Sequence, residues 1–126
     1  MLRLLPQKIL TQTRRFAVDG FGRVKTGPKM EKLVKNLKKG DEVLTPYGPA
    51  KILEVTKQNI PNGFYEMAEF NQMLITPNHP IKIYDEWTLP KEVQEIKFAK
   101  CQAIYSVKID KYHILTINGN NIQCET

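Results

Sequence analysis

The sequence contains no long uninterrupted apolar run and only two cysteines among its 126 residues. A membrane-crossing helix needs about 18 or more consecutive apolar residues, so we expect no transmembrane helix and no membrane partner. Two cysteines are too few for the disulfide framework of a small secreted protein, and a secretory apolar region with a small-residue cleavage site is missing. These absences favour a globular chain in a reducing, cytoplasmic compartment.

Acidic residues are absent from residues 1–16, which contain Arg3, Lys8, Arg14 and Arg15. This segment carries most of the net charge of +6, because residues 17–126 hold 15 basic and 13 acidic residues. The lysines there are not interleaved with aromatic residues that could stack on bases, so we expect no nucleic-acid partner. The acid-free start is similar to a mitochondrial presequence, which leaves import as an alternative to a tag or to the flank of a larger protein.

Residues 17–126 have the length of one domain, because a single hydrophobic core usually organises about 100–150 residues. Frequent glycine and proline residues separate short β-branched or alternating runs, a pattern typical of strands. The predicted strands cover residues 42–45, 50–56, 64–70, 73–76, 81–84, 104–109 and 113–117. In 51–56 and 105–109 apolar and polar residues alternate, which predicts that each strand buries one face and exposes the other. We therefore predict an all-β, mainly antiparallel domain.

One segment has a helical pattern. Met30, Leu33, Val34 and Leu37 follow the i, i+3, i+4, i+7 spacing of a helix face, and Gly40 can end a helix. We predict a single short helix here, and the conformation of residues 91–101 stays open.

The chain has two histidines, His79 and His113, and each lies in a patterned segment. His79 follows Thr76-Pro77-Asn78, so it can be a plain turn residue, and His113 can be a half-buried strand residue. A histidine can also act as a general acid or base near neutral pH. The surrounding motifs decide between these interpretations.

Three motifs in order resemble the Hint superfamily, which includes inteins and the hedgehog autoprocessing domain. The pattern v-x-x-L-x-x-G-D-x-V matches residues 34–43, and T-x-x-H-P matches residues 76–80. A late strand at residues 104–109 is followed by His113. The resemblance implies a compact, horseshoe-like all-β fold of many short strands.

The Vint branch, found beside von Willebrand type A domains, is a still closer match. It has a G-D-x-V-x-T-P-x-G-x-A run, as in residues 40–50, and an L-I-T-P-x-H-P-I run, as in residues 74–81. A Trp and a Pro follow at Trp87 and Pro90, and an N-G pair at residues 118–119 precedes the C-x-T ending at residues 124–126. The resemblance covers nearly all of residues 17–126.

The resemblance implies self-cleavage or splicing through an N-to-S acyl shift. A leading cysteine attacks the carbonyl just upstream, which converts an amide to a thioester. By resemblance, His79 contacts that peptide and protonates its leaving amine, and Thr76 orients the same peptide. The substrate is then the flanking polypeptide of the same chain, and we expect a monomer.

The position of the nucleophile departs from the family. The family's C-x-x-G stretch falls on Ala17-Val18-Asp19-Gly20, so Ala17 stands where a cysteine is expected and Phe16 precedes the scissile bond. A methyl group cannot attack, so this chain as written is predicted to be an inactive precursor. The alternatives are that Ala17 replaces a cysteine, or that Ala17 is native and the domain is a non-catalytic interaction module.

The C-terminal end leaves two interpretations open. Inteins end with an asparagine that cyclises, whereas this register offers Gln123 followed by Cys124. Gln123 can cyclise only through a slower six-membered ring, and Cys124 can be the downstream nucleophile. Alternatively, Gln123 is a strand residue and Cys124 a small buried apolar side chain. His113 resembles the family's late histidine and is a candidate for assisting this second step.

We predict neither a metal nor a cofactor. A zinc site can be drawn from His79, His113, Cys101 and Cys124, but the close spacing of Cys and His ligands in structural zinc sites is missing. Cys101 is most simply structural.

Overall fold

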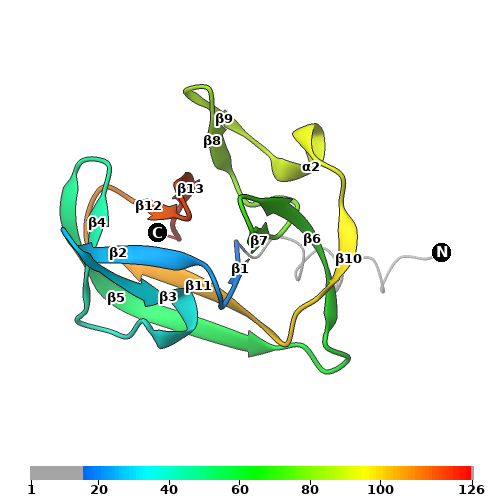
Figure 1. Cartoon of the computed structure of the whole chain (residues 1–126), viewed down its shortest axis with the longest axis horizontal. Coiled ribbons are helices and arrows are strands. Elements are labelled where there is room, and N and C mark those ends of the chain that lie inside the picture. Colours follow the sequence, from blue (N-terminus) through cyan, green and yellow to red (C-terminus); the bar gives the residue numbers. More distant parts are fainter. Residues whose placement is uncertain (1–15, 126) are drawn as a thin grey trace.

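The computed structural model describes residues 16–125 as short strands wrapped around a common core (Figure 1). Thirteen strands, one 3₁₀ turn at Val34–Asn36 and one short helix, α2 at Pro90–Val93, make up this region. The strands are β1 Val18–Asp19, β2 Arg23–Gly27, β3 Met30–Leu33, β4 Glu42–Thr45, β5 Gly48–Asn59, β6 Phe64–Phe70, β7 Met73–Ile75, β8 Ile81–Ile83, β9 Glu86–Thr88, β10 Lys97–Lys100, β11 Ala103–Ile109, β12 Ile114–Ile117 and β13 Asn120–Gln123. The all-β prediction is confirmed.

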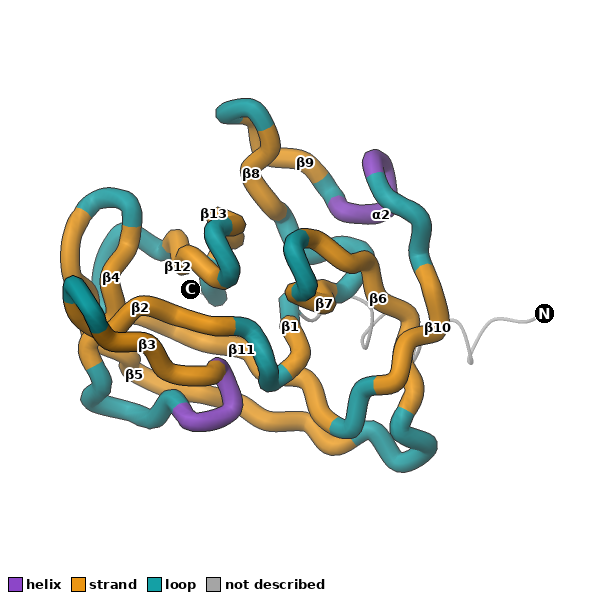
Figure 2. Tube along the Cα trace, in the orientation of Figure 1, coloured by secondary structure: helices purple, strands orange, loops and turns teal. Residues whose placement is uncertain are grey.

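A seven-stranded sheet has the strand order β10-β6-β7-β1-β11-β5-β4. The first described strand, β1, therefore lies in the middle of the sheet, antiparallel to β7 on one side and to β11 on the other. β5 is the longest strand and pairs with both β4 and β11 (Figure 2). This order places the start of the domain at the centre of the fold.

Two smaller sheets complete the fold. β12, β13, β8 and β9 form a four-stranded sheet, and β2 and β3 form a hairpin. β8 pairs with β13, with Ile81 opposite Ile122, so the segment after His79 lies beside the C-terminal end of the described chain.

Two clusters of apolar side chains form the core. The larger one includes residues of both larger sheets, such as Val18, Ile75, Ile109 and Ile117. The smaller one consists of Ala17, Ile60, Met67, Cys101 and Ile104. The clusters lie on opposite faces of β11, because Ile104 belongs to one and its strand neighbour Tyr105 to the other.

The predicted helix over residues 30–37 is wrong. Residues 30–33 form β3, which pairs with β2, and only Val34–Asn36 make a 3₁₀ turn. Met30, the first residue of the helical pattern, is 65% exposed, while Val34 and Leu37 are buried. The apolar spacing is satisfied by a strand that ends in a tight turn, and cross-strand hydrogen bonds override the local pattern.

The structure also settles the conformation of residues 91–101. Pro90 begins α2, where its missing N–H costs nothing, and the chain then forms β10 along the edge of β6. The alternation predicted for β11 is only partly right, because Ser106 is buried as well as Tyr105, Val107 and Ile109. Ser106 is covered by the N-terminal segment of the domain.

The presequence interpretation of the first 16 residues rests on residues 1–15, which lie outside the described part of the chain. Within residues 16–125, every helix is too short or too polar to span a bilayer.

Candidate active site at the Phe16–Ala17 peptide bond

The register of β1 determines which side chains reach residue 17. Val18 pairs with Ile75 of β7 and with Tyr105 of β11. Because both pairs are antiparallel, the residue before Val18 lies beside the residue after Ile75 and the residue after Tyr105. Those neighbours are Thr76 and Ser106, and both side chains are buried.

Thr76 holds Ala17 from two sides. The Ala17 N–H donates to Thr76 Oγ1 at 3.2 Å, and the Thr76 hydroxyl is also 3.2 Å from the Ala17 carbonyl oxygen, to which it can donate. The Thr76 N–H donates to the same carbonyl at 3.0 Å. The orienting position expected for Thr76 is therefore occupied, and its oxygen touches the nitrogen of the Phe16–Ala17 peptide.

Ser106 holds the other half of that peptide. Its hydroxyl donates to the Phe16 carbonyl oxygen at 2.5 Å. Two buried hydroxyls thus contact the two polar atoms of one peptide bond, Ser106 at the carbonyl of Phe16 and Thr76 at the N–H of Ala17. The sequence pattern does not reveal this role of Ser106, because the alternation in residues 105–109 assigns its side chain to the solvent face.

A tight turn places His79 next to this peptide. The His79 N–H donates to the Thr76 carbonyl at 3.2 Å, and Pro77 occupies the turn position that favours its fixed φ. The imidazole is 4% exposed and stacks on the Phe16 ring, with ring centroids 5.1 Å apart. The turn thereby brings Thr76 and His79 to the same peptide.

The hydrogen bonds of His79 define its tautomer. Nε2 lies 2.6 Å from the Gln123 carbonyl oxygen, and a carbonyl only accepts, so Nε2 carries the proton. Nδ1 is buried and forms no hydrogen bond of ordinary geometry with any residue in the 16–125 range. A neutral ring therefore presents an unused lone pair at Nδ1.

Burial keeps this ring neutral. The pKa of His79 is lowered from 6.5 to about 4, chiefly because burial removes water from the charged form. The Gln123 carbonyl, and to a smaller degree the Ala17 backbone, favour the proton and partly offset this effect. At neutral pH the imidazole of His79 is therefore uncharged.

The C-terminal candidates lie on the other side of His79. The Gln123 N–H donates to the Pro80 carbonyl at 3.1 Å, and the Cys124 N–H donates to the His113 carbonyl at 2.9 Å. Cys124 is 3% exposed, and burial raises its pKa to about 12, so the thiol stays protonated at neutral pH. Cys124, Phe16 and His79 line one narrow, mainly apolar cavity of about 10 Å³.

The structure places His113 away from these contacts. It lies in the turn before β12 with a positive φ of 52°, and its side chain is exposed. Within the described chain, only its backbone carbonyl is linked to the site, through Cys124. Of the predicted residues, the fold brings together Phe16, Ala17, Thr76, His79 and Gln123, places Cys124 beside them, and leaves the His113 side chain outside.

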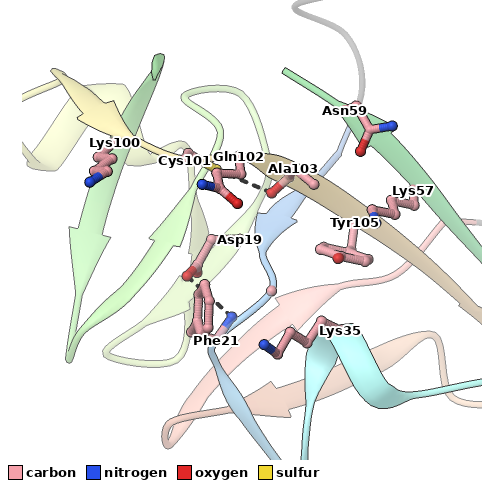
Figure 3. Close-up of a pocket in the computed structure, with 11 residues that line it drawn as sticks. Asp19, Phe21, Lys35, Lys57, Asn59, Lys100, Cys101, Gln102, Ala103 and Tyr105 are labelled. Carbon is pink, nitrogen blue, oxygen red and sulfur yellow. Dashed lines mark hydrogen bonds between the residues drawn. The ribbon is translucent and has the colours of Figure 1, made fainter. Parts of the chain in front are cut away.

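A larger pocket of about 510 Å³ opens next to β1 but does not include Thr76, His79 or Ser106 (Figure 3). In it, the Asp19 carboxylate accepts from the N–H groups of Phe21 and Leu74 and fastens the end of β1 to β7. The Cys101 thiol donates to the Ala103 carbonyl, and burial raises its pKa. Lys57 and Lys100 lie on opposite sides of Asp19 (Figure 3).

Metal ligands do not gather at the site. Among residues 16–125, no group of three or more His, Cys, Asp or Glu side chains lies close enough to hold an ion.

Comparison with known proteins identifies the family. The profile of the Vint family, described as a Hint domain, matches residues 17–126. The chain belongs to the Vint family of Hint domains. The match begins at Ala17, and the peptide bond before this residue is the one that Thr76 and Ser106 contact. No curated protein matches this chain in sequence.

Solved structures show the same fold. The bacterial intein-like domain from Clostridium thermocellum has a TM-score of 0.68 and 15% identity, covering 89% of this chain and 99% of that one. The gp41-1 intein gives 0.65 and 16%, covering 88% and 99%. A DnaB intein from Synechocystis sp. PCC 6803 gives 0.64 and 13%, covering 89% and 100%. The Vint domain therefore has the Hint fold of autoprocessing and splicing domains.

Proposed function

We propose that this Vint domain acts once on its own backbone, by an N-to-S acyl shift at the Phe16–Ala17 peptide. The reactive form carries cysteine at position 17, and the shift leads to self-cleavage or splicing of the flanking polypeptide. The chain with Ala17 is then a precursor held before its first chemical step. The supporting observation is that Ser106 and Thr76 bind the two polar atoms of this peptide, 2.5 and 3.2 Å away.

The proton path follows from the state of His79. In the reactive form, Nδ1 accepts the proton of the residue-17 thiol, and the thiolate attacks the Phe16 carbonyl carbon. His79 then returns that proton to the residue-17 nitrogen as the C–N bond breaks, which leaves a thioester and a free α-amino group. The general-acid role expected for His79 thus begins with a general-base step, because a ring with a pKa of about 4 has no spare proton at neutral pH.

A second cleavage at the Gln123–Cys124 peptide uses the same imidazole. The His79 Nε2–H donates to the Gln123 carbonyl and makes its carbon more electrophilic for attack by the Gln123 side-chain amide. The raised pKa of Cys124 argues against its thiol as the nucleophile while it is buried.

The test is the variant Ala17→Cys of the full chain. We expect loss of residues 1–16 when a small thiol is added, because the thiol intercepts the thioester, and intact mass spectrometry measures the loss. The matched control is the double variant Ala17→Cys with His79→Gln, which retains the nucleophile but lacks a base. An Ala17→Cys chain that folds and stays intact with thiol for days contradicts the proposal.

A second candidate is a non-catalytic interaction module in which Ala17 is native. The observation in its favour is the fit of the Ala17 methyl group, which is completely buried in the cluster with Ile60, Met67, Cys101 and Ile104. A folded but inert Ala17→Cys variant would support this candidate. Determining the codon for residue 17 in the natural gene separates the two independently.

A further inference from the structure

Ser106 is a polar residue whose side chain is buried within the seven-stranded sheet. It is 4% exposed, and its strand neighbour on the same face of β11, Ile104, belongs to the smaller apolar cluster with Ala17. A hydroxyl buried among apolar side chains is costly unless it is hydrogen bonded. The bond that satisfies it goes to the Phe16 carbonyl oxygen, the atom that gains charge in the acyl shift proposed above.

We propose that Ser106 is a catalytic residue of the Vint domain, the donor that polarises the Phe16 carbonyl and stabilises the oxyanion formed there. This role rests on the proposed function. The pairing of β11 with β1 places the Ser106 hydroxyl at the Phe16 carbonyl.

The other side chains of the site are committed to different atoms. Thr76 Oγ1 contacts the Ala17 N–H and carbonyl, and His79 Nε2 donates to the Gln123 carbonyl. The Ser106 hydroxyl, by contrast, donates to the Phe16 oxygen. Deprotonation of the residue-17 thiol and protonation of the leaving nitrogen are thus assigned to His79, and stabilisation of the oxygen to Ser106.

The hydrogen bond from Ser106 to the Phe16 oxygen is stronger in the transition state of the acyl shift than in the ground state. When the residue-17 sulfur bonds to the Phe16 carbon, the carbonyl π electrons move to oxygen, and the tetrahedral intermediate carries a negative charge there. Its collapse restores the carbonyl as a thioester and expels the residue-17 nitrogen, which takes the proton from His79. A hydrogen bond to a charged oxygen is roughly twice as strong as one to a neutral carbonyl, and removing one such donor typically costs about 10²- to 10³-fold in rate.

The hydrogen bond is tested first in the chain with Ala17. With the Phe16 carbonyl labelled with ¹³C, Ser106→Ala is expected to move its NMR signal upfield, because the oxygen loses a donor. Ser106→Thr, which retains a hydroxyl, should restore most of the shift. Thr56→Ala is the matched control, because Thr56 pairs with Ser106 across the sheet and also loses a hydroxyl. A Phe16 signal that does not move in a folded Ser106→Ala chain overturns the inference.

Catalysis is tested in the Ala17→Cys background by the rate of thiol-induced release of residues 1–16. Ser106→Ala should lower this rate about 10²- to 10³-fold, with Ser106→Thr within about tenfold of the parent and Thr56→Ala unchanged. Thermal unfolding of each variant shows that the fold is retained. Equal rates with and without the Ser106 hydroxyl, in a chain that cleaves, overturn the inference but leave the proposed function standing.

Two further outcomes are distinguishable. If Ala17→Cys never cleaves while the Phe16 signal still responds to Ser106, the proposed function fails and the catalytic role fails with it. If hydroxylamine releases residues 1–16 from the chain with Ala17, and Ser106→Ala prevents this, Ser106 is a nucleophile rather than a donor and the inference is wrong.

Discussion

His79 connects the two ends of the described chain through one buried ring. Its face stacks on Phe16, and its Nε2–H donates to the Gln123 carbonyl. A single side chain therefore contacts both the Phe16 ring and a carbonyl 44 residues after itself in sequence. Its chemistry depends on the burial that keeps it neutral, so the same burial should be measurable as a pH dependence of stability.

We expect the free energy of unfolding to fall as the pH drops from about 6.5 to 4. The unfolded chain binds a proton on His79 below about pH 6.5, whereas the folded chain resists it until about pH 4. The stabilisation is therefore complete above the unfolded pKa and is lost as the pH falls, by about 3 kcal/mol in total. Urea unfolding at a series of pH values measures it.

The control for this pH dependence is His79→Gln, which can still donate to the Gln123 carbonyl but does not titrate. The pKa of Asp19 is raised by burial and that of Asp41 is lowered by Lys32 and Lys38, and both carboxyls titrate in either chain. The difference between the two curves therefore isolates His79. Parallel curves would show that the imidazole is charged or solvated in the folded state.

At the scale of elements, the short strand β1 determines the geometry of the site. It contains two residues, yet it pairs on both sides, and the chain leaves it through Gly20 and Gly22 toward β2. A Cβ on Gly22 would overlap the Cγ2 of Ile117, which is completely buried. The close approach of these two segments therefore requires glycine at residue 22.

Gly22→Ala is expected to destabilise the domain by about 1–3 kcal/mol, because the methyl group overpacks the core against Ile117. Gly27→Ala is the matched control, because its Cβ would meet Met30 at an ordinary 3.7 Å. That control should change the free energy of unfolding by less than about 1 kcal/mol. Urea titration compares them, and equal stabilities would mean that the chain after β1 moves away from Ile117 without cost.

For the whole molecule, the central place of β1 puts the start of the cleavage product inside the sheet. Ala17 and Val18 are 0% and 2% exposed, and β1, which begins at Val18, fills the gap between β7 and β11. The product of cleavage retains these residues. The fold can therefore survive its own reaction, provided that the cut falls before Ala17.

We expect a chain that begins at Ala17 to fold and a chain that begins at Gly20 to unfold. Of the described residues, the first lacks Phe16 alone, whereas the second leaves the facing edges of β7 and β11 unpaired and uncovers both apolar clusters. Circular dichroism and dispersion of amide NMR signals distinguish the two. A well-folded chain beginning at Gly20 would show that β1 is dispensable for the sheet.

The sequence by itself determined the all-β class and the positions of seven strands. It also determined that Thr76 and His79 lie in one tight turn. Each depends on local signals, namely turn residues, alternation and short spacing, which act within a few residues. The strand at residues 30–33 was not visible in this way, because its apolar spacing also fits a helix and its pairing with β2 decided the outcome.

Only the tertiary structure decided the roles of Ser106, Cys124 and the His113 side chain. Ser106 has the pattern of a solvent-facing residue, and it is buried because the segment that begins at Phe16, 90 residues earlier in the chain, lies beside it. The low pKa of His79 and the raised pKa of Cys124 likewise follow from removal of water by distant segments. Local pattern therefore predicts which residues are available for chemistry, whereas long-range register decides which atoms they touch and in which protonation state.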